Sequence, residues 1–263
     1  MVDNKAYFNN IPYDLPKTAF SCQVIGSRGS GKSQLIKKLL DIYTPQIEKI
    51  NRYLISPTAY LDNTLSDFFD HDNIFSEYND AIISFIEDFI KVKMEKEKLN
   101  IYEKTLKDME LTQEDVNFMD EKDKRAIERK YKNNLKKYYR PDHNLLVIED
   151  SLGTFKAKSK LTYLFTRHRW YNLSVIISSQ SFRSIPVVIR NNCILNFVFQ
   201  TNNKELKKIE EEFDNYKDTS NFIKMFHKYA VDYNTLFINR GMPKKKQYYQ
   251  NLNKKINMEE FEK

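Results

Sequence analysis

Three of the five glycines in this 263-residue sequence fall within six positions, in the segment GSRGSGKS at residues 26–33. Gly26, Gly31, Lys32 and Ser33 occupy the fixed positions of the pattern G-x-x-x-x-G-K-S/T, whose backbone amides cradle phosphates. Glycine lets such a loop adopt positive φ angles and aim successive N–H groups inward. A helix that starts directly after the loop adds its partial positive charge. We therefore expect a triphosphate-binding loop here.

The chemistry of this pattern assigns a role to each side chain of the loop. Lys32 is expected to reach the β- and γ-phosphates of ATP, and Ser33 to supply a hydroxyl to Mg²⁺. The predicted nucleotide-binding residues are Gly26, Ser27, Arg28, Gly29, Ser30, Gly31, Lys32, Ser33 and Gln34. The alternative is a chance glycine turn. The strand predicted before the loop and the helix predicted after it argue against that alternative.

Two acids end an apolar run, LLVIED, at residues 145–150. A continuous apolar run indicates a buried parallel strand, so its final carboxylates would lie at the sheet edge beside the loop. One carboxylate could hold the Mg²⁺ hydration shell, and the other could orient or deprotonate the attacking water. Glu149 and Asp150 are the candidates, as metal and catalytic residues. An ordinary acidic strand end is the alternative.

Gln180 ends a second apolar run, SVIISSQ. A polar side chain at this strand tip can contact the γ-phosphate and the water that attacks it. This role is typical of ATPases whose sheet inserts a strand between the phosphate-loop strand and the acidic strand. The GTPase signature N-K-x-D is missing, and so is the arginine-rich lid typical of small-molecule kinases.

The elements that must position these residues alternate along the chain. Strands are predicted at 18–25, 50–58, 144–150, 173–180, 192–200 and 234–240, and helices at 33–43, 64–70, 156–170 and 204–213. Alternating strands and helices predict an α/β fold with a mostly parallel central sheet flanked by helices.

One region breaks this alternation. Residues 79–140 are dense in charge, contain no glycine or proline, and read as a helical insertion of two or three helices with a start at Thr112. The alternative is a solvated helical hairpin that has no catalytic or binding role. We predict a single P-loop ATPase domain over 1–263, with the insertion inside it and a basic C-terminal tail at 241–263.

Composition limits the classes of partner. The net charge of +7 and the pI near 9.0 fit a polyanionic partner. No apolar run reaches the roughly 18 residues of a membrane span, and residues 1–20 hold no apolar signal core, so we expect no membrane span and no secretion. Cys22 and Cys193 lie in apolar runs and are expected to be buried free thiols. The histidines share no ligand spacing with them, so no structural zinc is predicted.

Several segments together resemble the FtsK–HerA superfamily of P-loop ATPases, and most closely the poxvirus-type genome-packaging ATPases of large DNA viruses and virophages. They are GSRGSGKS, YLISPTAY, LLVIED, TRHRWYNLSVIISSQSFRSIP and IRNNC. The resemblance covers about residues 15–60 and 143–240. It implies a RecA-like (ASCE) core that assembles as a homo-oligomeric ring, a hexamer or pentamer, around double-stranded DNA, with ATP between subunits.

The resemblance also implies roles for individual residues. Lys32 and Ser33 match the family's phosphate-loop positions, and Gln180 matches its polar sensor. Arg169 lines up with an arginine proposed to act on a neighbour's nucleotide, and Arg167 is its rival. An arginine finger of this kind is worth about 10³ or more in rate. A solvent-facing helix end or a DNA phosphate contact is the alternative for either arginine.

The sequence departs from the family pattern at two places. The family usually shows Asp first and then a second acid, whereas this chain has Glu149 followed by Asp150. By position Glu149 would face Mg²⁺ and Asp150 would face the attacking water. Which acid binds the metal and which activates the water stays open. Trp170 stands where relatives often carry His.

A DNA motor needs cations that hold the backbone of any sequence. The candidates for DNA contact are Arg183, Arg190, Lys244, Lys245, Lys246, Tyr248 and Tyr249. A plain solubilising terminus is the alternative for the last five. The basic helix within the insertion could face DNA, a neighbouring subunit or the capsid.

These expectations combine into a function. The sequence favours an ATP-driven, Mg²⁺-dependent translocase of double-stranded DNA that packages a viral genome, with capsid proteins as further partners, in the host cytoplasm (the viral factory) or the virion. One alternative is a RecA-like helicase or DNA-partition ATPase. An alternative of another class is a scaffold that binds nucleotide and DNA without hydrolysis.

Overall fold

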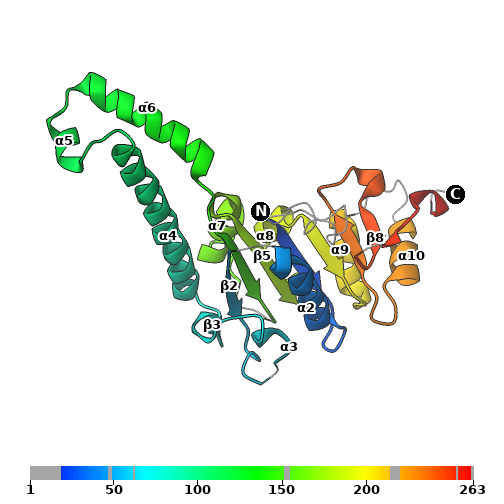
Figure 1. The fold of residues 1–263 in the computed structure, drawn as a ribbon. Helices are drawn as coiled ribbons and strands as arrows, with labels where there is room; N and C mark the ends of the chain where they lie inside the picture. The colour runs from blue at the N-terminus through cyan, green and yellow to red at the C-terminus, as the bar shows by residue number, and fades with distance from the viewer. Residues whose placement is uncertain are drawn as a thin grey trace. The chain divides into compact units, whose positions relative to one another are not determined.

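The computed structural model describes residues 19–46, 49–61, 63–150, 155–213, 220–252 and 254–261. The chain divides into two compact units. The first comprises Met1–Ser84 and His143–Lys263, and the second comprises Phe85–Asp142. Figure 1 traces the elements of both units along the chain.

A nine-stranded sheet organises the described part of the first unit, in the order β3-β2-β4-β5-β1-β6-β7-β8-β9. Its strands are β1 Ser21–Ile25, β2 Ile50–Ile55, β3 Ile74–Phe75, β4 His143–Ile148, β5 Leu173–Ser179, β6 Leu195–Val198, β7 Leu236–Asn239, β8 Tyr248–Gln250 and β9 Lys254–Lys255. From β3 to β6 all neighbours are parallel, whereas β7, β8 and β9 join antiparallel. The predicted fold class, α/β with a mostly parallel sheet, is confirmed.

Helices connect the strands of this sheet. The α-helices of the first unit are α2 Lys32–Tyr43, α3 Asn63–Ser66, α7 Lys160–Arg167, α8 Val187–Asn192, α9 Asn203–Phe213 and α10 Ser220–Tyr229. Short 3₁₀ turns lie at η2 Thr44–Gln46, η3 His71–Asn73, η4 His168–Tyr171, η5 Lys244–Lys246 and η6 Met258–Glu260. Of these helices, α8 and α10 lie where no helix was predicted from sequence.

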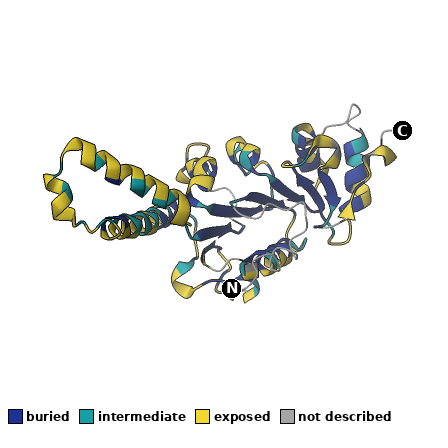
Figure 2. Ribbon diagram, turned by 45° about the horizontal axis from the view of Figure 1, so that its top comes forward, coloured by how far each residue is buried: buried dark blue, intermediate teal, exposed yellow. Residues whose placement is uncertain are grey.

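The handedness of the crossovers places helices on both faces of the sheet. From β1 the chain passes through α2 to β2 in one direction, and from β4 through α7 to β5 in the other. Because parallel crossovers are right-handed, α2 covers one face while α7 and α8 cover the opposite face. Figure 2 shows the buried strands between these two layers of helices, whose outer sides are exposed.

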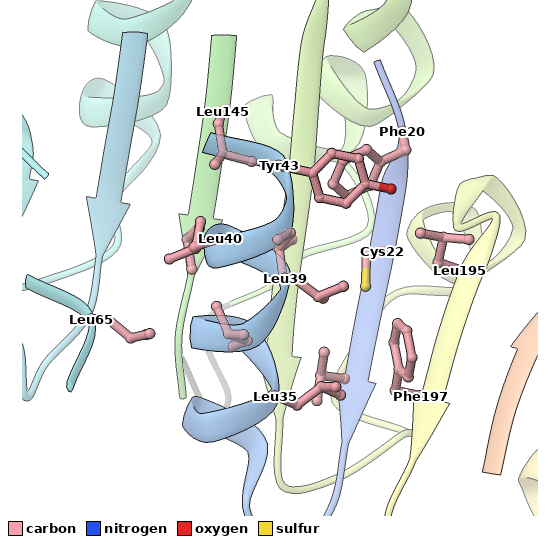
Figure 3. Packing of buried hydrophobic residues seen from close by; sticks show 14 of the residues in the cluster. Phe20, Cys22, Leu35, Leu39, Leu40, Tyr43, Leu65, Leu145, Leu195 and Phe197 are labelled. Atoms are coloured by element: carbon pink, nitrogen blue, oxygen red, sulfur yellow. The ribbon is translucent and has the colours of Figure 1, made fainter. Parts of the chain in front are cut away.

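The core forms where α2 packs on the sheet. Leu35 and Leu39 of α2 belong to one buried cluster with Cys22 of β1 and Phe197 of β6 (Figure 3). These apolar positions recur at helical spacing, which is why this segment folds as an amphipathic helix on the sheet. Burying such side chains stabilises the fold by about 1.5–3 kcal/mol each. Both Cys22 and Cys193 are buried free thiols, as predicted.

The segment predicted as a basic tail contributes to the sheet. Tyr248 and Tyr249 of β8 are buried, and the Tyr248 hydroxyl donates to the carbonyl of Phe213 at 2.6 Å. The pattern from the sequence was too short to indicate these strands. β8 pairs antiparallel with β7, and β9 pairs antiparallel with β8.

The second unit is helical. It contains most of α4, Asp80–Lys107, with α5 Gln113–Phe118 and α6 Glu121–Tyr138. The rings of Tyr102 and Tyr131 meet edge to face with centroids 5.3 Å apart. Thr112 caps α5, because its side chain accepts from the amide of Asp115 and the Asp115 carboxylate accepts from the amide of Thr112. The helix start predicted at Thr112 is confirmed.

Candidate active site

The glycine-rich loop joins β1 to α2 with backbone angles that only glycine adopts easily. Gly29 has φ of 75° and Gly31 has φ of 101°. Gly31 precedes the first residue of α2 and its carbonyl accepts from the amide of Leu35 at 3.0 Å, so the loop turns directly into the helix. The helix N-terminus therefore faces the loop interior, which suits an anion.

Gly26 serves a different purpose from the other two glycines. A Cβ at Gly26 would lie 2.5 Å from Ser30 Oγ and 2.7 Å from Phe199 Cβ, both too close for a real contact. Its amide donates to the carbonyl of Ser179 at 3.2 Å, which ties the loop to β5. The first glycine of the motif thus allows close packing of the loop against the strand ends.

Lys32 lies at the centre of the loop and is buried. Its ammonium donates to the carbonyls of Gly26 at 3.0 Å and Ser27 at 3.1 Å, and Asp150 Oδ1 lies 3.8 Å away. A flexible ammonium held by two backbone carbonyls can turn toward phosphate oxygens. Of the other predicted nucleotide-binding residues, Ser27, Arg28 and Gln34 are exposed.

Ser33 and Glu149 meet beside this lysine. The Ser33 hydroxyl donates a hydrogen bond to Glu149 Oε1, and the Ser56 hydroxyl donates to Oε2 at 3.0 Å. Pairing of β2 with β4 sets Ile55 opposite Ile148, so the next residue on each strand carries one partner of this bond. Glu149 is therefore fixed on both oxygens and points at the loop serine.

Asp150 and Gln180 meet on the other side of Lys32. Gln180 Nε2 donates to Asp150 Oδ2 at 3.2 Å, whereas Asp150 Oδ1 is buried and accepts no hydrogen bond in the described structure. The φ of Asp150 is 46°, in the left-handed region that short Asp and Asn tolerate best. The strand β5, which ends directly before Gln180, lies between β4 and β1 as predicted.

These side chains fit a magnesium ion held together with a nucleotide. In the described part of the chain, no group of three His, Cys, Asp or Glu side chains could hold a metal by itself. Mg²⁺ usually keeps several waters and binds one or two carboxylates plus substrate phosphates. The Ser33 hydroxyl and the Glu149 carboxylate, in contact beside the phosphate loop, are such a set.

Glu205 on α9 supports the loop that follows Gln180, and nothing in the sequence pattern indicated it. Its carboxylate is nearly buried and accepts from the amides of Phe182 at 2.7 Å and Arg183 at 3.2 Å, and from the Ser181 hydroxyl at 3.1 Å. An acid in the first turn of a helix is usually explained by its favourable interaction with the helix dipole. Here it fixes a loop from a distant part of the chain.

Arg167 and Arg169 do not join these groups within the chain. Both are exposed and lie before β5, at the end of α7 and in η4. The phosphate loop follows β1, which is parallel to β5, so β5 separates the arginines from the loop. Its seven residues span about 20 Å.

Three of the residues predicted to contact DNA are buried. Arg190 donates to Glu212 at 2.9 Å and to the carbonyl of Ile185 at 2.9 Å, and it lies over the ring of Phe182. Its role is structural, and the prediction for it is wrong. The prediction is also wrong for Tyr248 and Tyr249, whose rings cannot stack on bases because they are buried in the sheet layer. Arg183, Lys244 and Lys246 remain exposed.

The match to a known protein family extends over most of the chain. The chain matches the family described as "Poxvirus A32 protein" over residues 58–249. The protein belongs to this family. The resemblance to the poxvirus-type genome-packaging ATPases is thereby confirmed, and with it the prediction that the chain is an ATPase. In this Poxvirus A32 family member the matched range contains β4, β5 and Gln180, and the phosphate loop precedes it.

Solved structures share the fold at low sequence identity. EssC (ATPases 2 and 3) from Geobacillus thermodenitrificans has a TM-score of 0.51 and 13% identity, over 90% of this chain and 40% of that one. The cytoplasmic domain of the type VII secretion ATPase EccC from Thermomonospora curvata has a TM-score of 0.50 and 14% identity, over 90% and 24%. The genome packaging NTPase B204 from Sulfolobus turreted icosahedral virus 2, with AMPPCP, has a TM-score of 0.46 and 16% identity, over 86% and 94%.

No curated protein sequence matches the chain significantly. Among the described residues, no helix is both long and apolar enough to cross a membrane.

Proposed function

We propose that this protein is an ATP-driven translocase of double-stranded DNA that packages a viral genome into a capsid. One observation carries the proposal: Lys32, Ser33, Glu149, Asp150 and Gln180 converge beside the phosphate loop from two separate strand ends and one helix start. Hydrolysis of a triphosphate needs a phosphate cradle, a metal-binding acid, a water-activating acid and a polar sensor. The convergence supplies one group for each need.

The proposed roles follow from the partners of each side chain. Lys32 neutralises charge on the β- and γ-phosphates, and the loop amides bind the remaining oxygens. Asp150, with an oxygen that accepts no described hydrogen bond, orients and deprotonates the attacking water. Gln180 holds the second oxygen of Asp150 and reports on the γ-phosphate. Ser33 and Glu149 hold Mg²⁺, which when bound neutralises the triphosphate charge.

The proposed assembly is a homo-oligomeric ring, a hexamer or pentamer. Arg167 and Arg169 are exposed at the sheet edge opposite the loop, so neither can serve the nucleotide of its own chain. In a head-to-tail contact, the edge that carries the arginines in one subunit meets the edge that carries the phosphate loop in the next. Repeated contacts of this kind close into a ring. In that arrangement Arg169, or Arg167 in its place, acts on the neighbour's nucleotide.

The proposed DNA contacts are the predicted cations other than Arg190, which is buried. Arg183 follows the sensor glutamine by three residues, so a change at the nucleotide can move it. Lys244 and Lys246 are exposed and are proposed as further contacts, together with Lys245, whose side chain lies outside the described residues. The setting proposed for this activity is the host cytoplasm, at the viral factory, or the virion, with capsid proteins as partners.

Hydrolysis of ATP tests the proposal directly. Steady-state turnover with Mg²⁺ is expected to rise severalfold when long duplex DNA is added, and Lys32→Ala is expected to abolish it. Lys38→Ala is a matched control, because Lys38 also lies in α2 and its side chain is exposed outside the phosphate loop.

Three other results would redirect the proposal. Turnover near background with and without DNA would support the scaffold that binds without hydrolysis. Much stronger stimulation by single strands than by duplex would support the helicase. Full activity of Lys32→Ala would place the active site elsewhere.

A further inference from the structure

A cavity of about 300 Å³ adjoins the phosphate loop on the side away from the two acids. One wall is the loop itself, residues 27–30, and the other walls are Phe199 with Gln200 and residues 232–234. The strands β5 and β6 flank β1 on opposite sides. The acids and Gln180 lie at the ends of β4 and β5, whereas the cavity lies between the end of β6 and the start of β7.

Tyr233 is the prominent side chain of this cavity. It is 79% exposed although it is a large aromatic residue, and a Cβ added at Gly31 would lie 3.8 Å from its ring. The backbone at Asp232 and Tyr233 has φ of 49° and 65°, a conformation that is costly for a bulky residue. An exposed ring in a strained backbone beside a phosphate loop points to binding.

Hydrogen bonds hold this strained turn in place. The Asn234 side chain donates to the carbonyl of Val231 at 2.8 Å and accepts from Asn251 Nδ2 at 2.7 Å. Asn251 also accepts from the amide of Thr235 at 3.0 Å through its Oδ1. The ring of Tyr233 is therefore presented from a braced loop, and a braced ring loses little freedom when it binds a ligand.

The chemistry of the walls decides which part of a nucleotide fits. Tyr233 offers an exposed, flat apolar ring, whereas Phe199 is buried and forms the wall behind it. The Asp232 carboxylate repels phosphate, while it can accept hydrogen bonds from sugar hydroxyls or amino groups. A triphosphate whose γ end faces the two acids after β4 and Gln180 after β5 must extend its other end toward β6 and β7. We propose that this cavity is the nucleoside subsite, in which Tyr233 stacks on the base and Asp232 and Gln200 bind its polar edge or sugar. The inference rests on the proposed function, since it needs a nucleoside triphosphate in the loop.

Binding of two probes to the full-length protein tests the subsite. Calorimetry with Mg²⁺ would compare a non-hydrolysable ATP analogue with inorganic tripolyphosphate, which has no base or sugar. Tyr233→Ala is expected to weaken binding of the analogue about 5- to 100-fold, the range for loss of one stacked base, and to leave tripolyphosphate binding unchanged. Tyr233→Phe keeps the ring and is expected to bind like the wild type. Tyr163→Ala, at an exposed tyrosine of α7, is the matched control.

The outcomes separate this inference from the proposed function. If Tyr233→Ala binds the analogue like the wild type, the subsite is wrong, while loss of binding in Lys32→Ala would keep the phosphate site. If Tyr233→Ala weakens both probes equally, the ring shapes the phosphate loop and the subsite is also wrong. If the wild-type protein binds neither probe, the proposed function fails, and the subsite fails with it. Thermal unfolding of each variant identifies a loss of binding that is caused by misfolding. If Tyr233→Ala is misfolded, Gln200→Ala decides: weaker binding of the analogue alone supports the subsite, and wild-type binding of both probes overturns it.

Discussion

The two acids at the end of β4 differ in backbone conformation, and this difference explains their order. Glu149 continues the strand and reaches the Ser33 hydroxyl, whereas Asp150 turns into the left-handed region with φ of 46°. Asp tolerates that region better than Glu because its short carboxylate can bond locally. A longer acid at the second position would be strained. The unusual order Glu then Asp therefore fits this turn.

Exchange of each acid for its amide should separate their roles. Asp150→Asn suits the same backbone turn, and we expect it to lower kcat about 10²- to 10⁴-fold with little change in nucleotide affinity, because a general base is lost. Glu149→Gln should raise the Mg²⁺ concentration for half-maximal hydrolysis about 10- to 100-fold. Steady-state hydrolysis across a Mg²⁺ titration measures both effects. Asp41→Asn, on the exposed face of α2, is the control.

An inverted pattern would contradict the assignment. If Asp150→Asn shifts the Mg²⁺ dependence and Glu149→Gln lowers only kcat, the two acids have exchanged roles. If neither substitution changes hydrolysis, the water is activated by another group.

The loop after β5 and the helix α9 form one functional element because Glu205 joins them. Its carboxylate accepts from the backbone amides two and three residues after Gln180, so the tip of β5 depends on a helix that follows β6. The same loop carries Arg183, a proposed DNA contact. A shift of Gln180 with the nucleotide state would thus be transmitted to Arg183 through a fixed loop.

Removal of this carboxylate should lower turnover without loss of nucleotide binding. Glu205→Ala leaves two N–H groups without an acceptor, which costs about 2 kcal/mol of unfolding free energy, and we expect kcat to fall about tenfold because Gln180 is no longer fixed. Glu205→Gln keeps an acceptor oxygen and should restore most of the activity. Glu211→Ala, at an exposed position of α9, is the control. Denaturant unfolding, kcat and KM are the readouts.

A purely structural role would give a different result. Glu205→Ala would then lose stability but keep kcat at temperatures where the chain remains folded.

Local sequence predicted those elements whose physical signals are local. The phosphate loop and its strand and helix follow from Gly26, Gly31 and Lys32, and the buried parallel strands follow from continuous apolar runs. Arg190, Tyr248 and Glu205 were misjudged or missed because their surroundings are built by segments far apart in the sequence. Arg190 is buried against Glu212, and Glu205 binds residues more than 20 positions earlier. Charge or aromaticity alone does not reveal such pairing.

At the scale of the whole molecule, the proposed catalytic set needs two chains. The phosphate loop and the exposed arginines lie at opposite sheet edges, so the proposed arginine must come from a second copy. In the proposed ring, hydrolysis is a property of the assembly. Activity is then expected to depend on protein concentration.

Mixing two inactive variants should therefore restore activity. Lys32→Ala retains the arginines and Arg169→Ala retains the phosphate loop, so a mixed assembly contains interfaces with both. Each variant alone is expected to be nearly inactive, and the mixture to regain a measurable fraction of wild-type hydrolysis. Arg167→Ala in place of Arg169→Ala identifies which arginine acts. Mass in solution, with a non-hydrolysable ATP analogue, shows whether mixed assemblies form.

Absence of recovery would count against an arginine in trans only if mixed assemblies are present. A wild-type chain that stays monomeric with nucleotide and DNA, yet hydrolyses ATP, would contradict the ring.

Movement along duplex DNA is the measurement closest to the central claim. A third strand bound at the end of a long duplex can be displaced only by a protein that travels along the duplex to it. For a translocase we expect displacement that requires ATP and Mg²⁺, that takes longer on longer duplexes, and that disappears with Lys32→Ala. Hydrolysis of ATP stimulated by duplex DNA without any displacement of the third strand would contradict it.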